Sequence, residues 1–261
     1  MDLSIVVPAF DEELRLGPTL HEIVEYGRGR GLVFEVVVVD DGSRDGTATL
    51  VRRIGQLAPE VRLIRAGHNH GKGYAVRTGV LNTTGDLVLF ADADGATPIA
   101  ELERLERAVR QGAEVAIGSR SLRGEGVTVT ARWYRRAMGR TFHALVRLLT
   151  VRGITDTQCG FKLFRGPVAQ ELFSRAQMNG FSFDVELLML AQGRGYQVAE
   201  VPVNWTHKPG SRIRLVRDSL LMARDIFRIR GNLARGAYAA SHVAVTSDRP
   251  DAGGAGAHVR G

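Results

Sequence analysis

The sequence predicts an α/β protein with a mostly parallel, Rossmann-like sheet flanked by helices. Three short apolar runs, Ser4–Val7, Phe34–Val39 and Leu87–Ala91, each stop at a proline or at acidic residues. Such runs are typical of strands that are buried on both faces, as they are in parallel sheets. Helical patterns separate the runs, and alternating strands and helices favour a parallel sheet with right-handed crossovers.

The helices and a fourth strand follow from the same pattern. We expect helices over about Arg15–Arg28, Thr47–Leu57, Tyr74–Leu81 and Ile99–Gln111, and a strand at Glu114–Ile117. Ligands of open parallel sheets bind beyond the carboxyl ends of the strands. Acidic clusters follow two of the expected strands, so we expect the site at that edge.

The pattern changes after Ser119. Two segments mix arginines with bulky apolar residues and predict C-terminal amphipathic helices, at Arg132–Arg152 and Arg212–Arg235. Between them we expect a short loop with Asp156–Lys162, a helix around Phe183–Gln192 and a strand at Gln197–Val203.

Composition narrows the partners and the compartment. The formal net charge of +7 favours an anionic partner, which leaves nucleic acid, nucleotide phosphates and an anionic membrane. Cys159 is the only cysteine, which excludes an internal disulfide and a cysteine-rich metal site. No apolar run reaches the length of a transmembrane helix, and residues 1–4 show no secretory pattern, so a cytoplasmic location is expected.

The segment Asp92-Ala93-Asp94 is the sharpest chemical signal. Alternate residues of an extended segment point to the same side, so both carboxylates can face one ligand. Carboxylates with water and phosphate oxygens suit Mg²⁺ or Mn²⁺ holding a diphosphate. Loops and helix caps also use aspartate, but the position directly after a buried strand favours the metal.

Asp40 and Asp41 follow the second strand in the same way. Asp45 or Thr47 would serve as the N-cap of the next helix, which explains one acid of this cluster but not three. Asp40 and Asp41 are therefore candidates for accepting hydrogen bonds from a base and a ribose.

Taken together, these segments resemble a known family. The runs Ile5–Glu12, Val39–Ser43 and Ala91–Asp94 occur in the order and spacing of a family 2 glycosyltransferase with the GT-A fold. The later runs Asp156–Lys162 and Phe183–Glu186 resemble the dolichyl-phosphate β-glucosyltransferase branch. The similarity spans about Leu3 to Arg230. It implies one GT-A domain over residues 1–238, with a nucleotide-sugar-binding half (1–119), an acceptor- and membrane-facing half (120–238) and a disordered tail (239–261).

The resemblance also assigns roles on the donor side. It implies that the nucleoside is surrounded by Pro8, Ala9, Phe10, Glu12 and Asp40. It also implies that Asp92 and Asp94 contact the ribose, the diphosphate and the metal, and that Asp94 has a catalytic role. Asp11 stands where many members have asparagine, which puts any contact that needs an amide donor in doubt.

Lys72 lies in a glycine-rich segment, Asn69–Gly73, that fits neither the Walker loop nor the Rossmann fingerprint. The resemblance makes this a loop beside the donor, with Lys72 near the nucleotide. An ordinary turn before a helix explains the glycines equally well.

To bind and activate a polyprenyl phosphate acceptor, the protein would need positively charged side chains more than a general base. The second pKa of a phosphate monoester is about 6, so the acceptor is largely a dianion at neutral pH. By chemistry and by resemblance, the candidates for holding it are Arg120, Arg132, Arg136, Lys162 and Arg212. Arg120 and Lys162 are also assigned catalytic roles.

Two further residues, Asp156 and the nucleotide-sugar candidate Gln158, carry open interpretations. Asp156 is a candidate base or orienting residue, and its alternative is a loop cap before Thr157. Gln158 is a candidate contact of the sugar or phosphate. The arginines and aromatics of Arg132–Arg152 suit a helix in a membrane interface, and Arg212–Arg235 repeats the pattern. Two ordinary packed helices or a dimer surface are the alternatives.

The leading hypothesis is an inverting, metal-dependent transfer of glucose from UDP-glucose to polyprenyl phosphate, at the cytoplasmic face of a membrane and by peripheral attachment. Mannose from GDP-mannose is the nearest variant. A soluble hydroxyl acceptor would need a true general base at Asp156 or Asp184. The non-enzymatic alternative is a basic membrane- or nucleic-acid-binding module. The acidic strand ends and the lack of an RNA-binding motif argue against nucleic acid.

Overall fold

The computed structural model describes residues 1–130, 151, 153–208 and 215–239, and for residues 215–220 the backbone alone. In this part of the chain, seven strands form one sheet in the order β3-β2-β1-β4-β7-β5-β8. Their bounds are Leu3–Ala9 (β1), Phe34–Asp40 (β2), Val61–Arg65 (β3), Leu87–Ala91 (β4), Val115–Ser119 (β5), Phe161–Arg165 (β7) and Val198–Pro202 (β8).

The sheet is mostly parallel, as the sequence predicts. Strands β3, β2, β1 and β4 run parallel to one another, and β5 runs parallel to β8. Strand β7 is antiparallel to both of its neighbours, β4 and β5. A strand from the second half of the chain therefore lies between two strands of the first half.

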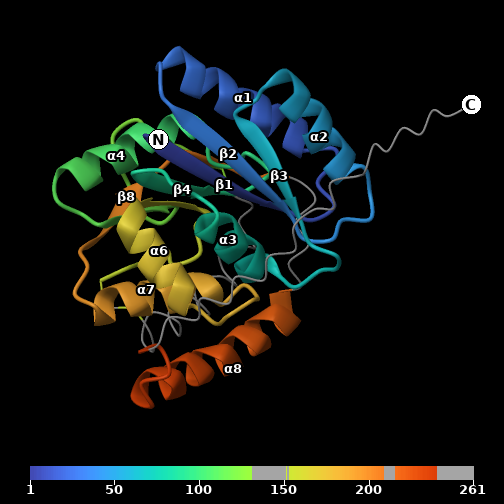
Figure 1. The fold of residues 1–261 in the computed structure, drawn as a ribbon. Coiled ribbons are helices and arrows are strands. Elements are labelled where there is room, and N and C mark those ends of the chain that lie inside the picture. Colours follow the sequence, from blue (N-terminus) through green and yellow to red (C-terminus); the bar gives the residue numbers. More distant parts are fainter. Residues whose placement is uncertain (131–150, 152, 209–214, 240–261) are drawn as a thin grey trace, which may run out of the picture.

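Helices cover both faces of the sheet (Figure 1). One face carries α1, α2 and α4, and the other carries α3, α6 and α7, with α8 packed outside α7. The bounds are Leu16–Gly29 (α1), Thr47–Leu57 (α2), Lys72–Leu81 (α3), Ile99–Glu101 (the 3₁₀ helix η1), Leu102–Arg110 (α4), Gly166–Arg175 (α6), Phe183–Gly193 (α7) and Leu215–Ala234 (α8).

Burial on both faces explains the continuous apolar strands. In β1, Ile5 and Val7 pack in the core beneath α1, α2 and α4, while Val6 packs in the core beneath α3, α6 and α7. Each such side chain stabilises the fold by roughly 1.5–3 kcal/mol when it leaves water. A strand with one exposed face would show alternating polar residues instead.

Several elements differ from the sequence-based expectation. Strand β3, helix α6 and the two-stranded sheet of β6 (Val129–Thr130) and β9 (Trp205–Thr206) were not predicted. The segment predicted as a loop through Lys162 enters β7 at Phe161. Arginine or lysine interrupts β3 and β7, and Gly166-Pro167 opens α6, so their sequences lack the apolar pattern of the other elements.

Of the two predicted amphipathic helices, the structure describes most of the second but almost none of the first. Apart from Val151, the segment Arg132–Arg152 lies outside the described residues, as does the tail from residue 240. Helix α8 confirms a helix within Arg212–Arg235, although residues 209–214 lie outside the described part. None of the helices described has the length and apolarity needed to span a bilayer.

Candidate active site

The carboxyl ends of β1, β2 and β4 lie side by side at one edge of the sheet. Ala9, the last residue of β1, is paired with Asp40, the last residue of β2. Strand β4 flanks β1 on its other side and leads directly into Asp92 and Asp94. The acidic segments singled out from the sequence therefore meet, as the parallel topology predicts.

The loop after β1 is fixed by hydrogen bonds to the loop after β2. Asp11 has a positive φ of 51°; its backbone N–H donates to Ser43 Oγ (2.8 Å), and its Oδ1 accepts from the backbone N–H of Arg44 (2.7 Å). Asparagine tolerates the same backbone conformation and offers the same acceptor oxygen, so aspartate here preserves the local geometry.

The remaining residues of this loop take different positions. Pro8 and Ala9 are buried within β1, and Phe10 is half-buried just beyond it. The Glu12 carboxylate forms an ion pair with Arg15 at 2.6 Å, and its backbone N–H donates to Thr47 Oγ1. Glu12 thus ties the start of α1 to the start of α2.

Asp40 and Asp41 are both buried, but their carboxylates have different hydrogen-bond partners. Asp40 Oδ1 accepts from the backbone N–H of Ser43 (2.8 Å), and Oδ2 lies 3.2 Å from Arg65 Nε without a hydrogen bond to any described residue. Asp41 accepts from the backbone N–H groups of His70 (2.9 Å) and Gly71 (2.7 Å). Asp41 therefore fixes the loop that precedes α3, while Asp40 keeps an acceptor oxygen available.

Lys72, the first residue of α3, reaches Asp92. Its Nζ lies 2.6 Å from Asp92 Oδ1. Burial of the ammonium lowers its pKa, but Asp92, Asp184 and Asp94 outweigh this effect, so the pKa of Lys72 is raised and it stays charged. The structure thus places Lys72 beside the carboxylate that follows β4.

The second carboxylate, Asp94, is half-buried, like Asp92. Its Oδ1 accepts from the backbone N–H of Ala96 at 3.0 Å. Burial is the main cause that raises the pKa of Asp94, and the like charge of Asp92 raises it further. Asp92 and Asp94 are therefore near enough to repel each other, and a cation between them would relieve that repulsion.

A fully buried ion pair lies within electrostatic range of Asp92 and Lys72. Lys162, on β7, places Nζ 2.5 Å from Asp184 Oδ1 and donates to the carbonyl oxygen of Cys159 (2.6 Å). Asp184 sits in the first turn of α7, and burial raises its pKa against the lowering effect of Lys162 and Lys72. The Lys162 ammonium therefore points into the protein, so its predicted contact with an acceptor has no direct geometric support.

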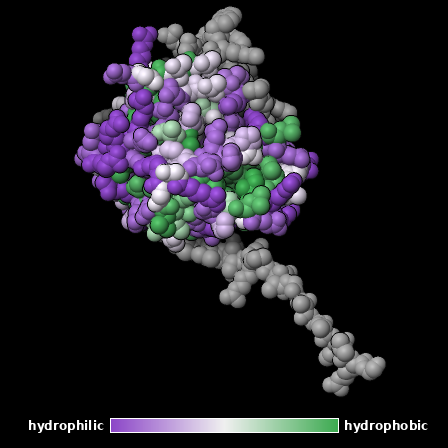
Figure 2. Space-filling view, turned by 90° about the horizontal axis from the view of Figure 1, so that it is seen from above, coloured by the Kyte–Doolittle hydropathy of each residue, from purple (hydrophilic) through white to green (hydrophobic). Residues whose placement is uncertain are grey.

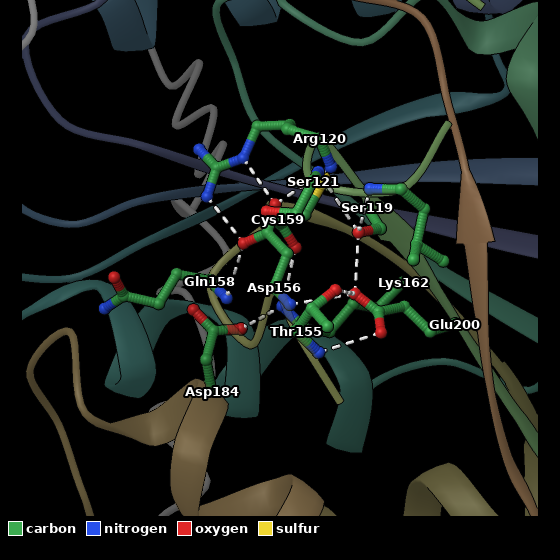
Figure 3. Close-up of polar contacts among 11 residues, drawn as sticks. Ser119, Arg120, Ser121, Thr155, Asp156, Gln158, Cys159, Lys162, Asp184 and Glu200 are labelled. Carbon is green, nitrogen blue, oxygen red and sulfur yellow. Dashed lines mark hydrogen bonds and ion pairs between the residues drawn. The ribbon is translucent and has the colours of Figure 1, made fainter. Parts of the chain in front are cut away.

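Arg120 and Asp156 form a second ion pair (Figure 3). Asp156 accepts from the Nε and Nη2 atoms of Arg120, both at 2.7 Å, and from its backbone N–H at 3.0 Å. The guanidinium lies over the Trp205 ring, 5.7 Å from its centroid. Arg120 also interacts electrostatically with Asp92.

Glu200, on β8, supports this pair and was not singled out from the sequence. Its carboxylate accepts from Ser119 Oγ (2.6 Å), from Thr155 and from the backbone N–H of Asp156 (2.8 Å), as Figure 3 shows. A lone acid in the strand sequence Val-Ala-Glu-Val-Pro is the signal that points to it.

The remaining candidates lie at the margin or outside the described residues. Gln158 Nε2 lies 3.2 Å from Met222 Sδ on α8, which brings that helix against the loop of Asp156. Arg132, Arg136 and Arg212 lie outside the described residues. Among those described, no three His, Cys, Asp or Glu side chains gather as metal ligands.

Carboxylates and cations therefore alternate across the site. Lys72 pairs with Asp92, and Arg120 and Asp94 both interact electrostatically with Asp92. Such an arrangement suits a polyanionic ligand bound together with a metal ion, because neither sign of charge dominates. Electrostatic stabilisation of a departing anion is the chemistry that it offers.

Comparison with known proteins points the same way. Residues 4–173 match the family described as glycosyl transferase family 2. The chain is 39% identical over 242 residues to a dolichyl-phosphate beta-glucosyltransferase of Drosophila melanogaster, covering 88% of this chain and 74% of that one. It is 37% identical over 249 residues to the Homo sapiens protein of the same name, covering 90% and 77%.

Solved structures share the fold at lower identity. Glucosyl-3-phosphoglycerate synthase from Mycobacterium tuberculosis in complex with UDP matches with a TM-score of 0.66 and 17% identity, covering 88% of this chain and 80% of that one. The same enzyme with Mn²⁺ and UDP-glucose matches with a TM-score of 0.63 and 18% identity, covering 90% and 78%.

Proposed function

Since the chain belongs to glycosyl transferase family 2, with the GT-A fold of its structural relatives, we propose that it moves glucose from UDP-glucose onto a polyprenyl phosphate of the dolichyl type. The glycosyltransferase class follows from the family and from the names of its relatives. One observation carries the choice of substrates. Relatives at 35–39% identity over most of the chain are named dolichyl-phosphate beta-glucosyltransferases.

In this proposal the donor lies across the carboxyl ends of β1, β2 and β4. Asp40 Oδ2, buried beside Arg65, accepts from the base. Asp41 acts indirectly, because its carboxylate is occupied by the backbone of the loop before α3. Lys72 supplies a positive charge to the diphosphate, since its side chain begins at the N-terminus of a helix and reaches Asp92.

Asp92 and Asp94 fit a divalent metal. They offer the carboxylate oxygens that Mg²⁺ and Mn²⁺ prefer, and Asp92 contributes to raising the pKa of Asp94, behind the larger effect of burial. Gly160 lies against Asp92, where a Cβ atom would stand 1.9 Å from Oδ2, so the carboxylate has a defined position. When bound, a divalent ion would supply Lewis-acid stabilisation of the departing diphosphate.

The acceptor phosphate needs no proton removed. One of its oxygens forms a bond to glucose C1 as the bond from C1 to the UDP oxygen breaks, and the electron pair leaves with UDP. Attack opposite to the leaving group inverts the configuration. Arg120 is the described cation best placed to orient the acceptor, because Asp156 uses two of its five guanidinium N–H groups and its side chain is 28% exposed.

Asp156 and Lys162 act as positioning residues in this proposal. The Asp156 carboxylate is held by Arg120 and by the backbone N–H of Gln158, which fits the orienting role better than that of a general base. Lys162 is buried against Cys159 and Asp184, so it fixes the floor of the site rather than contacting the lipid phosphate.

Helix α8 provides the membrane contact in this proposal. Its inner face packs through Met222, Ile226 and Ile229, while Phe227 is 65% exposed beside Arg224 and Arg228. An exposed aromatic among arginines suits the headgroup region of an anionic membrane. The opposite side of the molecule, with α1 and α2, shows mostly hydrophilic side chains with smaller hydrophobic patches (Figure 2). We therefore place α8 on the cytoplasmic face of a membrane.

The test is a transfer reaction with separate lipid and aqueous products. Purified protein is incubated with labelled UDP-glucose, Mg²⁺ or Mn²⁺, and detergent-dispersed polyprenyl phosphate, and label is followed into the organic phase. Parallel reactions contain GDP-mannose as donor, or 3-phosphoglycerate as acceptor.

Metal-dependent label in the lipid from UDP-glucose, lost in Asp94→Asn, supports the proposal. Label from GDP-mannose alone, or label in the aqueous acceptor alone, would contradict it.

A further inference from the structure

The ammonium of Lys72 occupies the carboxylate that the metal would use. Lys72 Nζ lies 2.6 Å from Asp92 Oδ1, and the two side chains are 22% and 36% exposed. A divalent ion on the same oxygen would bring two cations into contact. The repulsion between them would favour the departure of one cation from Asp92.

The backbone around Lys72 is fixed, so only the side chain is free to respond. Asp41 accepts from the backbone N–H groups of His70 and Gly71, and the backbone N–H of Tyr74 donates to the carbonyl oxygen of Asn179 at 3.2 Å. Gly71 has a φ of 110°, and a Cβ atom there would stand 2.5 Å from the same carbonyl oxygen. The start of α3 is therefore held on both sides.

A second carboxylate stands within reach of the Lys72 charge. Asp184 and Lys72 attract each other, and Asp184 is already paired with Lys162 at 2.5 Å. The two ammonium groups lie 5.2 Å (Lys72) and 5.7 Å (Lys162) from the centroid of the Phe90 ring. Lys162 has no exposed surface, whereas Lys72 is part-exposed, so Lys72 is the cation that can move.

The balance of charge around Asp92 agrees with an exchange of Lys72 for a divalent ion. Asp92, Asp94 and Asp184 carry three negative charges against the two positive charges of Lys72 and Lys162. A divalent ion alone would leave the cluster one charge positive. A nucleotide diphosphate arriving with the ion brings the compensating negative charge, and it offers Lys72 a new partner.

We propose that Lys72 is an exchangeable counter-ion that holds Asp92 in the absence of donor and moves to the diphosphate and the side of Asp184 when a divalent cation binds. The proposal rests on the metal site proposed above. It makes cation binding weak until the nucleotide arrives, which favours entry of metal and donor together.

The first experiment measures Mn²⁺ binding to the full chain without nucleotide, by electron paramagnetic resonance of the free ion. We expect Lys72→Met to bind Mn²⁺ about tenfold more tightly than the wild type, the equivalent of one part-buried ion pair. Lys72→Arg keeps the charge and should bind like the wild type. Arg53→Met, on the exposed side of α2, loses the same charge away from the site and should also bind like the wild type.

The outcomes separate cleanly. Equal or weaker Mn²⁺ binding by Lys72→Met, in protein whose circular dichroism matches the wild type, would overturn the proposal. Tighter binding by Arg53→Met as well would show a general charge effect, which would also overturn it. Because the readout is cation binding without donor, these results stand even where the lipid-labelling reaction fails.

A second experiment tests where Lys72 goes. With saturating UDP, the advantage of Lys72→Met should disappear, because wild-type Lys72 has left Asp92 for the diphosphate. Asp184→Asn should weaken Mn²⁺ binding by roughly threefold in the wild type but not in Lys72→Met, as expected for coupled neighbours. A tenfold advantage that persists with UDP would contradict the exchange. If Asp184→Asn does not fold, the UDP comparison decides this step.

Discussion

Asp156 holds Arg120 by three hydrogen bonds, two from the guanidinium and one from the backbone N–H. A carboxylate that binds one arginine through both its side chain and its backbone fixes where the guanidinium lies. Burial lowers the pKa of Arg120, but Asp156 raises it by more, so the arginine stays charged beside Asp92. The guanidinium is therefore a positive group held in a fixed position, on the side of the site where we propose that the acceptor binds.

Replacing Asp156 by asparagine should slow glucose transfer without weakening the binding of the donor nucleotide. The amide would place an N–H₂ group against the guanidinium and release Arg120 from its position. We expect kcat to fall on the order of 100-fold, the size of effect seen when one aligned donor is lost. Calorimetric UDP binding should change by less than about threefold. A large loss of UDP affinity would place Arg120 on the donor instead.

Gly160→Ala should damage the Asp92 site selectively. A Cβ atom there would stand 1.9 Å from Asp92 Oδ2, so the carboxylate must move. We expect roughly tenfold or greater loss of Mn²⁺ affinity in the presence of UDP, because a displaced ligand binds the ion poorly. Gly193→Ala, at the end of α7, has no neighbouring atom within 4 Å and serves as the matched control. Equal effects of the two substitutions would contradict this prediction.

Glu186 should make stability depend on pH. Its carboxylate accepts from the backbone N–H groups of Gln177 and Met178 and from the hydroxyl of Tyr238 (2.7 Å). Burial raises its pKa above the ordinary 4.5, against the lowering effect of these hydrogen bonds. The folded state then binds the proton more tightly than the unfolded state, so this contribution is complete below pH 4.5 and is lost as the pH rises through the raised pKa.

The measurement compares the wild type with Glu186→Gln, which does not titrate. The difference in free energy of unfolding, wild type minus variant, should be larger near pH 4.5 than near pH 8. At neutral pH the variant should still be less stable by about 1–3 kcal/mol, because glutamine offers fewer acceptors to the three donors. A difference that rises with pH would show that the carboxylate is stabilised in its charged form.

The exposed face of α8 should control vesicle binding. Phe227→Ser removes an apolar side chain that is 65% exposed, and we expect about tenfold weaker binding to anionic vesicles. Replacing Arg224 and Arg228 by glutamine should weaken binding most at low salt, since each arginine contributes about 1 kcal/mol near an anionic surface. Leu57→Ser, 78% exposed on the opposite side, is the control and should leave vesicle binding unchanged.

The parallel part of the fold was predictable because its signal is local. Strands β1, β2 and β4 are continuous apolar runs, and acids follow or end β2 and β4, so both the sheet and the gathering of these acids at one edge follow from the sequence. Strand β7 was not predictable in the same way. Lys162 interrupts its apolar pattern, and the fold buries this lysine only because Asp184, from α7, arrives to pair with it.

The same reason limits how much of the proposed acceptor side of the site can be predicted from the sequence. Asp156 and Arg120 were singled out separately, but their pairing depends on how the loop before β7 lies against the end of β5. Glu200 comes from a third segment and completes the arrangement. Contacts between segments this far apart in the chain depend on the tertiary fold and leave no periodic pattern in the sequence.

The antiparallel strand β7 has a consequence for building new enzymes from this one. It forms hydrogen bonds with both β4 and β5, so the fragment 1–119 would be left with two unpaired strand edges in the middle of its sheet. A chimaera joined after residue 119 would replace a central strand together with the acceptor side. If the acceptor binds where we propose, its recognition is inherited with part of the core, and exchanging it requires a graft that keeps β7 in place.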